Sequence, residues 1–322
     1  MKVLLACAAA VIFLCASSSP VTASFEGPIQ TRNLFPLSLH LDQPFLEKAA
    51  TESSMSYSLS HSSTYVVQDS ADWDIGLDME ITEINFIYRR TVRDLFEISA
   101  SIPVIITGGG FMDNFVENFH KAFGFSDYGR SNRPHNEFLY SVSRDGAPVI
   151  SGKSGTRLGD IRLAVKQPLL SSDGYRLSVQ GSVEVPVSSS EQGFSNGSLD
   201  GGASLLLDAA VTEKVMTFWN VGGVFPGDVR GHERVNVRNY FHAGAAVEMM
   251  LGRGFSGLVQ VQGQSGTYPD TGVDAVDGWA YLIAFGGRYQ KEGRVFDLSL
   301  TEDLNTTGVP DFIINLTYKF RL

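Results

Sequence analysis

The feature that most constrains the fold of this 322-residue chain is an alternation of apolar and polar residues that recurs in segment after segment. In one example, Tyr175, Leu177 and Val179 are separated by single polar residues. Because successive side chains of a strand point to opposite faces, this pattern predicts strands with one apolar and one polar face. About 12 segments show the pattern, at 53–67, 73–90, 95–106, 157–169, 174–187, 201–212, 214–225, 239–251, 254–264, 278–290, 294–302 and 311–321.

The connections between these segments fall into two classes that alternate along the chain. Tight turns such as 291–293 alternate with longer loops, at 107–156, 188–200, 226–238, 265–277 and 303–310. Barrels of bacterial outer membranes sort their turns in this way, and a sheet in a bilayer must close because hydrocarbon offers no hydrogen-bond partner. The sequence therefore predicts an all-β fold, a transmembrane antiparallel up-and-down β-barrel of about 12 strands over 53–322, in the outer membrane of a Gram-negative bacterium.

A periplasmic β-sandwich or soluble barrel is the alternative, with the apolar faces forming a core. The stripe of Trp279, Tyr281, Ile283 and Phe285 separates the two hypotheses, since it faces lipid in a membrane barrel and lies between two sheets in a sandwich. Aromatic residues near many segment ends are typical of interfacial girdles and favour the barrel. Within 73–90 the apolar parity changes near 82–84, which predicts a bulge or a differently placed hairpin.

The first 23 residues have the pattern of a cleavable secretory signal. Lys2 is followed by an apolar stretch and by the small-residue pattern that ends at Ala23. Both cysteines, Cys7 and Cys15, lie in this stretch, so the mature chain is expected to contain none, which excludes disulfides, zinc–thiolate sites and a cysteine nucleophile. Residues 24–52 are predicted to be a periplasmic N-terminal segment or a plug inside the barrel.

Composition narrows the class of protein further. The net charge of −10 argues against nucleic acid as a partner. Apolar runs in the mature chain are strand-sized, which excludes a helical membrane protein.

Two stretches carry a resemblance to a known family. They are GGGFMDNFVENFHKAFGFSDYGR with RPHNEFLYSVSRDG, at 108–130 and 133–146, and TEDLNTTGVPDFIINLTYKF at 301–320. The chain resembles an uncharacterised family, a domain of unknown function, of Gram-negative outer-membrane β-barrel proteins. The resemblance implies location and fold, and it transfers no activity to any residue. Arg321 and Leu322 follow the terminal aromatic Phe320, so the C-terminal signal for the outer-membrane assembly machinery is weakened rather than absent.

A short amphipathic helix is predicted within the long loop 107–156, because phenylalanines recur there at four-residue spacing. They are Phe111, Phe115, Phe119 and Phe123. One hypothesis is a lid or constriction over or inside the barrel. The other is a helix on the rim or at the outer-leaflet interface, anchored by its phenylalanines. A basic cluster follows, which could meet lipopolysaccharide phosphates or an anionic solute, or could simply be solvated: Arg130, Arg133, His135 and Arg144.

Strand parity predicts a set of charged residues that face the lumen. They are of mixed sign, which favours internal salt bridges over a single-sign selectivity ring. The set comprises Arg162, Lys166, Arg176, Glu184, Asp208, His242, Glu248, Arg288, Asp297 and Lys319.

We predict no catalytic residue, metal site or cofactor. Ser195 lies in a Ser-Asn-Gly stretch similar to one in outer-membrane phospholipases, but Gly193 stands where that family needs a histidine. The expected function is a passive or gated channel for small solutes, with outer-membrane lipid and lipopolysaccharide as surroundings. The alternatives are a structural or adhesive envelope barrel without transport, and an outer-membrane lipid hydrolase.

Overall fold

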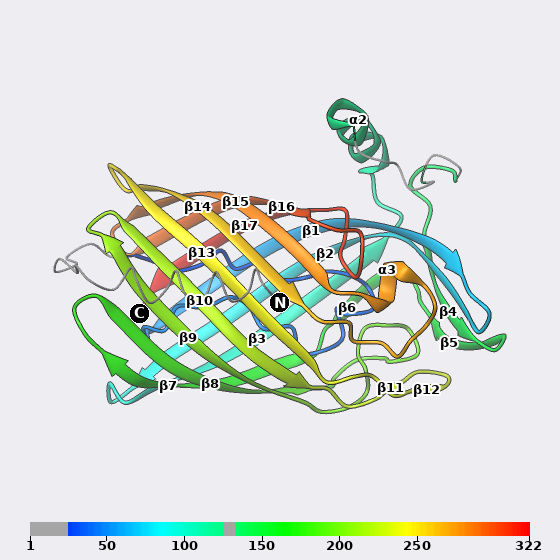
Figure 1. The fold of residues 1–322 in the computed structure, drawn as a ribbon, viewed down its shortest axis with the longest axis horizontal. Coiled ribbons are helices and arrows are strands. Elements are labelled where there is room, and N and C mark those ends of the chain that lie inside the picture. The colour runs from blue at the N-terminus through cyan, green and yellow to red at the C-terminus, as the bar shows by residue number, and fades with distance from the viewer. Residues whose placement is uncertain (1–24, 125–129, 131–132) are drawn as a thin grey trace, which may run out of the picture.

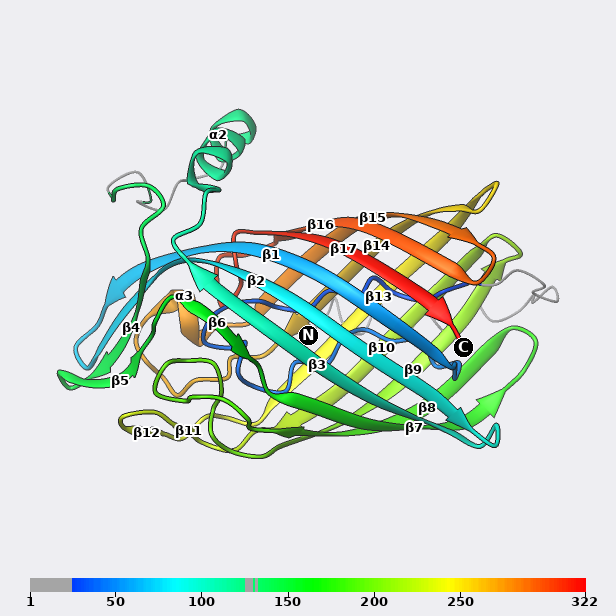
Figure 2. The same cartoon turned by 180° about the vertical axis from the view of Figure 1, so that it is seen from behind.

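A computed structural model describes residues 25–124, 130 and 133–322, so the expected signal peptide lies outside the described residues. Twelve antiparallel strands form a closed barrel (Figures 1 and 2), as the sequence predicted. Each wall strand pairs with the next wall strand along the chain, and the first pairs with the last to close the sheet. They are β1 (Ser54–Asp69), β2 (Trp73–Val92), β3 (Phe96–Gly108), β7 (Ile161–Ser171), β8 (Tyr175–Val185), β9 (Asp200–Thr212), β10 (Val215–Phe225), β13 (Tyr240–Gly252), β14 (Phe255–Gln264), β15 (Ala280–Lys291), β16 (Arg294–Asp303) and β17 (Phe312–Arg321).

The two ends of the barrel differ in their connections (Figure 1). One end, here the short-turn end, holds the C-terminus and tight turns such as Glu292-Gly293, where both residues have positive φ as a type I′ hairpin requires. The other, the long-loop end, carries the remaining elements. They are α2 (Asp113–Phe123), β4 (Leu139–Arg144), β5 (Ala147–Ser151), β6 (Gly155–Leu158), β11 (Val229–Arg230), β12 (Arg234–Val235) and α3 (Asp274–Asp277). No helix in the described part of the chain is long and apolar enough to cross a membrane.

The strand β6 continues the path of β7 along β3. Val104 lies opposite Leu158 and Ser101 lies opposite Arg162, so one extra residue stands on the β6–β7 side. This two-against-one spacing is a β-bulge, and it explains why the sequence predicted one segment where the structure has two strands.

The outward face of the wall is apolar. Trp279 and Tyr281 stack at 6.1 Å between ring centroids and are exposed, as is Phe285 on the same stripe. Because this stripe faces out of a single closed sheet, the sandwich alternative is wrong. Further aromatic pairs, such as Phe296 with Tyr318 at 4.7 Å, lie toward the short-turn end.

The predicted irregularity of β2 near 82–84 is also wrong. The pairing of β2 with β1 runs without a register shift, and the inward positions continue from Trp73 through Ile81 to Glu83 and Arg89. What changes is the chemistry of the barrel interior, which is apolar around Trp73 and Ile81 and largely polar farther along, at Glu83, Asn85 and Arg89. A single strand with two kinds of inward neighbour therefore produced the apparent parity change.

Candidate functional site: the plugged barrel interior

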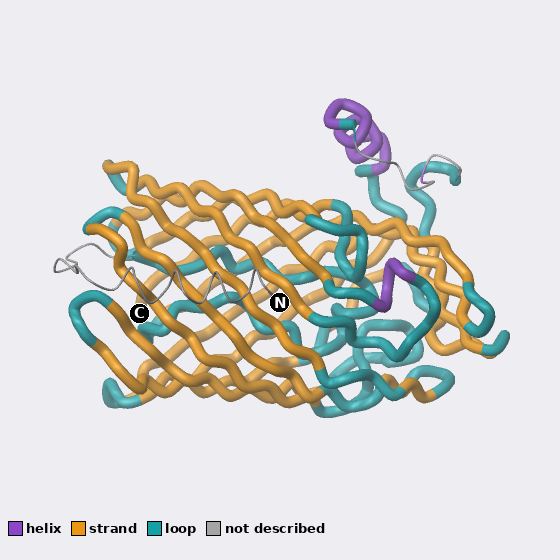
Figure 3. The backbone as a smooth tube through the Cα atoms, viewed as in Figure 1, coloured by secondary structure: helices purple, strands orange, loops and turns teal. Residues whose placement is uncertain are grey.

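Residues 25–52, here called the plug, run through the inside of the barrel (the dark-blue path in Figure 1, teal in Figure 3). Nearly all of them are buried. Glu26 pairs with Arg321 at the short-turn end, Asn33 donates to Gly308 O in the loop between β16 and β17, and Glu52 returns to Lys319. The plug is therefore a hairpin that reverses near the long-loop end and has both ends at the short-turn end.

The backbone of the plug is irregular because prolines interrupt it at Pro28, Pro36 and Pro44. Its amide groups find side chains of the wall instead of a strand ladder. Ile29 N donates to Gln260 at 3.0 Å, and Glu47 N donates to Asn220 at 2.8 Å. Buried backbone groups need such partners, so the wall and the plug complete each other's hydrogen bonding.

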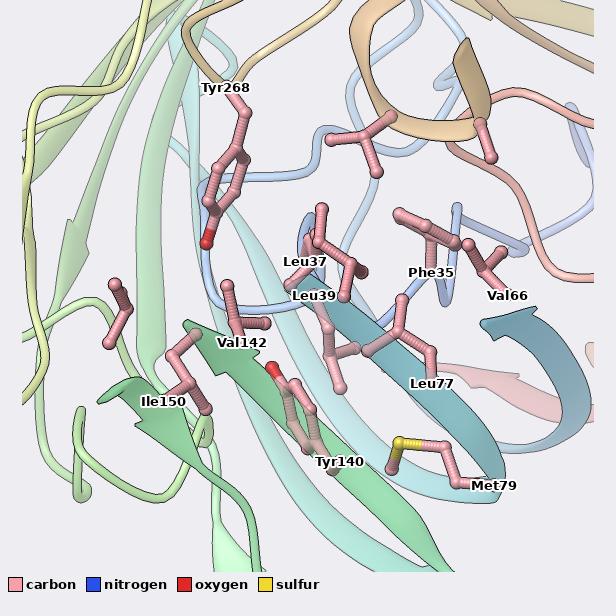
Figure 4. Close-up of a cluster of buried hydrophobic side chains, with 14 of the residues drawn as sticks. Phe35, Leu37, Leu39, Val66, Leu77, Met79, Tyr140, Val142, Ile150 and Tyr268 are labelled. Carbon is pink, nitrogen blue, oxygen red and sulfur yellow. The ribbon is translucent and has the colours of Figure 1, made fainter. Parts of the chain in front are cut away.

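The reversal of the plug lies in an apolar cluster at the long-loop end, here called the cap core (Figure 4). Leu34, Phe35, Leu37 and Leu39 of the plug pack there against the inner face of β2, against β4 and β5, and against the long loops. Tyr140 of β4 donates its hydroxyl to Pro36 O at 3.1 Å. The loops thus fold onto the plug and close this end of the barrel.

His40 of the plug lies under the cap core, with its Nε2 3.4 Å from the Tyr268 hydroxyl. Burial lowers the pKa of His40 to about 4. The ring is therefore neutral at neutral pH.

Ion pairs join the middle of the plug to the wall. Arg162 of β7 donates to Asp42 at 2.7 Å, and Lys166 lies 3.3 Å from Glu47 and 2.9 Å from the wall carboxylate Glu97. Arg89 of β2 lies 3.8 Å from Glu47. Two plug carboxylates therefore meet three wall cations at one level of the lumen.

A second group of ion pairs lies toward the short-turn end. Arg288 pairs with two wall carboxylates, Asp297 at 2.7 Å and Glu248 at 2.9 Å. Lys319 pairs with Glu26 of the plug at 2.7 Å. Arg288 is thus neutralised largely by the wall itself, in contrast to Arg162.

Two cavities between the plug and the wall are small. One cavity of about 20 Å³ is lined by Arg89, Lys166, Lys319 and plug residues. Another, also about 20 Å³, lies between Gln43, Leu46 and the wall residues His242 and Gln262. Each has room for about one water molecule, so the plug fills the lumen at these two places.

Most of the predicted lumen residues are buried on the inner face: Arg162, Lys166, Glu184, Asp208, His242, Glu248, Arg288, Asp297 and Lys319. Arg176 is exposed near the short-turn end, in register with Asp208. Sequence reasoning missed Arg89 and Glu97, which alternate correctly within predicted strands and could have been found by parity. It also missed Asp42 and Glu47, because the plug has no periodicity.

The helix α2 lies outside the barrel. Met112 and Val116 pack against Phe312 and Ile314 on the outward face of β17, and the Phe115 ring lies 5.7 Å from that of Phe312. The hypothesis of a lid or constriction inside the barrel is therefore wrong for the described part of this loop. The side chains of Phe119 and Phe123 lie outside the described residues, while Phe111 is 73% exposed.

The start of α2 is held by Glu80 of β2, which accepts the backbone N–H groups of Phe111 and Met112. Each member of the basic cluster lies beside a carboxylate. Arg130 (with Asp113 and Asp311), Arg133 (with Asp78) and His135 (with Glu117) brace the region around α2. Arg144 instead joins the end of β4 to Glu233 in the loop between β11 and β12.

Ser195, from the Ser-Asn-Gly stretch, and Asp277, in the loop between β14 and β15, both hold loop backbone. Ser195 is fully buried, and its Oγ accepts the Gly197 N–H at 2.9 Å. Asp277 accepts the backbone N–H groups of Thr271 and Gly272.

Comparison with known proteins places this architecture in a family. A family model described as a protein of unknown function (DUF3187) matches residues 3–322. The chain belongs to the DUF3187 family. This confirms the resemblance inferred from the motifs at 108–146 and 301–320. No curated protein matches the sequence.

Among solved structures, this DUF3187 protein is similar to an outer membrane channel from Pseudomonas putida F1. The TM-score is 0.56 at 12% identity, over 85% of this chain and 96% of that chain. The NanC porin gives a TM-score of 0.48 at 10% identity, over 83% and 100% of the two chains. At 12% identity, the likeness to the Pseudomonas putida channel shows the fold alone, a closed barrel of the outer-membrane type.

Proposed function

We propose that this DUF3187 protein is a gated outer-membrane channel for small solutes, closed by residues 25–52 and opened when that plug moves. In this proposal the short-turn end faces the periplasm and the long loops face outward, as in outer-membrane barrels generally. After cleavage at Ala23, the plug would have a free N-terminal end and would be joined covalently to the barrel at its other end, after Glu52.

The observation that carries the proposal is the nature of the inner wall. The inward positions of β1 are small hydroxyl residues, namely Ser54, Ser56, Ser58, Ser60 and Ser62. Gly244, Ser204 and Ser182 lie on the inner face of other strands. A barrel without a pore can fill its lumen with large side chains of its own strands. Here a separate segment fills the space, and its departure would leave a passage with polar walls between the cap core and the short-turn end.

The proposal is tested by locking the plug to the wall. A Cβ at Gly244 would lie 2.6 Å from Cδ2 of Leu46, an atom that Leu46→Cys removes, and 2.8 Å from the backbone oxygen of Val261. A small shift of the wall at Val261 therefore lets Leu46→Cys and Gly244→Cys bring two thiols within cross-linking reach. The only native cysteines lie in the expected signal peptide. In planar bilayers we expect no conductance when the two thiols are joined, by oxidation or by a short bifunctional thiol reagent. Reduction of the disulfide should restore channel openings. Leu46→Cys alone is the control and should be indifferent to oxidation.

A structural barrel without transport is the second candidate, and the cap core favours it because it closes the long-loop end. The same measurement separates the two. If the reduced double variant shows no conductance and its plug stays protected from protease, the barrel is permanently filled and gating is contradicted.

A further inference from the structure

We propose that Arg89, Arg162 and Lys166 form a binding site for a small dicarboxylate solute, which Asp42 and Glu47 of the plug occupy in the closed state. The inference rests on the proposed gating, since the site is uncovered only when the plug moves. It names the class of solute that the lumen would recognise.

The first support is the balance of charge at this level. The three cations are buried and come from the inner faces of β2 and β7. Glu97 is the wall carboxylate in ion-pair contact with them, 2.9 Å from Lys166 and 4.0 Å from Arg89. Glu184 lies opposite Arg162 in the strand register and interacts with it electrostatically, but its carboxylate is not among the ion-pair partners of Arg162, which are Asp42 and Glu47. Departure of the plug therefore removes both carboxylates that contact Arg162.

The second support is geometric. Asp42 and Glu47 both bind Arg162, at 2.7 Å and 4.0 Å, and Glu47 extends from there to Lys166 at 3.3 Å. A cluster that holds two carboxylates around one guanidinium matches a solute with two carboxylates on a short spacer. Arginine suits this role because its planar donors bind carboxylates in fixed geometry.

The third support is that the plug satisfies the site incompletely. The Nη1 atom of Arg89 is buried and has no hydrogen-bond partner among the described residues. The small cavity lined by Arg89, Lys166 and Lys319 lies beside it. A free anion is not tied to the plug backbone, so it can approach Arg89 more closely than Glu47, which stays 3.8 Å away.

Competition between solute and plug gives a test that needs no conductance. Succinate is added to the full mature chain in detergent, and hydrogen exchange is followed at the plug amides around Asp42 and Glu47. We expect succinate to speed exchange, uncharged succinamide to have no effect, and butyrate to act only at about tenfold higher concentration, one charge-assisted contact being worth about that factor.

Variants assign the effect to the site. Arg162→Gln should raise the half-effective succinate concentration at least about tenfold. Arg288→Gln is the matched control, because Arg288 is a buried lumen cation with two wall carboxylates of its own, and its plug contact is with Gly27 O, away from the amides around Asp42 and Glu47. Glu47→Gln removes the competitor and should lower the half-effective concentration, which decides the matter if Arg162→Gln fails to fold.

Equal responses in Arg162→Gln and Arg288→Gln, or an unchanged response in Glu47→Gln, would overturn the proposed site. These outcomes are separate from those of the thiol lock. Reversible opening without a succinate effect would leave the channel and remove the site, whereas succinate binding to a barrel that never conducts would leave the site and remove the channel.

Discussion

Truncation of one plug side chain in the cap core should open the barrel without breaking its wall. Leu37 of the plug is 1% exposed and packs in the cap core with residues of β2 and the long loops (Figure 4). Leu37→Ala removes buried methyl groups and leaves a cavity, which costs about 2–5 kcal/mol in a packed core. Because the released plug has no such contacts, the whole loss falls on the closed state.

The expected change in population follows from this range. A loss of about 2–5 kcal/mol lowers the ratio of closed to released plug by a factor of roughly 30 to 5,000. We expect protease to cleave 25–52 faster by a corresponding factor, while the barrel strands stay protected, and we expect the variant to open more often in bilayers. Leu316→Ala is the matched control, since Leu316 is exposed on the outward face of β17.

One comparison decides whether the effect runs through the plug. In the background of Leu46→Cys and Gly244→Cys, oxidation should cancel the effect of Leu37→Ala on cleavage and conductance. If Leu37→Ala lowers the thermal stability of the barrel but leaves plug cleavage at the wild-type rate, the cap core does not control the plug and the reasoning is refuted.

Three further perturbations test separate parts of the molecule. Val259→Arg, at an outward position 43% exposed, should destabilise the protein by about 2–4 kcal/mol in liposome unfolding if that face meets lipid, against less than about 0.5 kcal/mol if it meets water. Acidification should release the plug, because its buried His40, with a pKa of about 4, resists a proton that the released plug accepts below its ordinary pKa of about 6.5. By pH 5 the difference is about 2 kcal/mol. His40→Gln should remove this part of the pH dependence of protease cleavage and leave the part that comes from Glu47, whose pKa, despite burial, the wall cations lower to about 2. Arg130→Gln should free α2, leaving Asp113 and Asp311 without their shared cation, seen as faster hydrogen exchange at α2 with no change at the plug.

The wall was predictable because the signal that encodes it is local. A strand with one face to lipid and one to a polar interior alternates with period two whatever its neighbours are. This is why segments such as 254–264 and 294–302 coincide nearly with β14 and β16. The same rule failed on β2, because its inward neighbours change from the cap core at Ile81 to polar plug contacts at Glu83.

The sequence did not decide whether residues 24–52 lie in the periplasm or inside the barrel, because no local pattern encodes their position. Its prolines exclude a regular element, and its partners, such as Asn220 and Gln260, lie far away in sequence and come together only when the barrel closes. The placement of α2 is similar. The four-residue spacing predicted the helix, but only the outward position of Phe312 shows which surface receives it.

The division of the interior into an apolar cap and an ionic middle suggests how a closed plug can still respond to a solute. Burial of Leu34, Phe35 and Leu37 gives net stability, because apolar surface leaves water. Buried ion pairs contribute little net stability, since the desolvation of both partners offsets their attraction. Exchange of Glu47 for a solute carboxylate therefore keeps Arg162 and Lys166 paired at small net cost, while loss of the cap core is costly. The cap should hold the plug in place and the ionic middle should select what displaces it, so a solute alone should loosen the region around Glu47 before it frees Leu37.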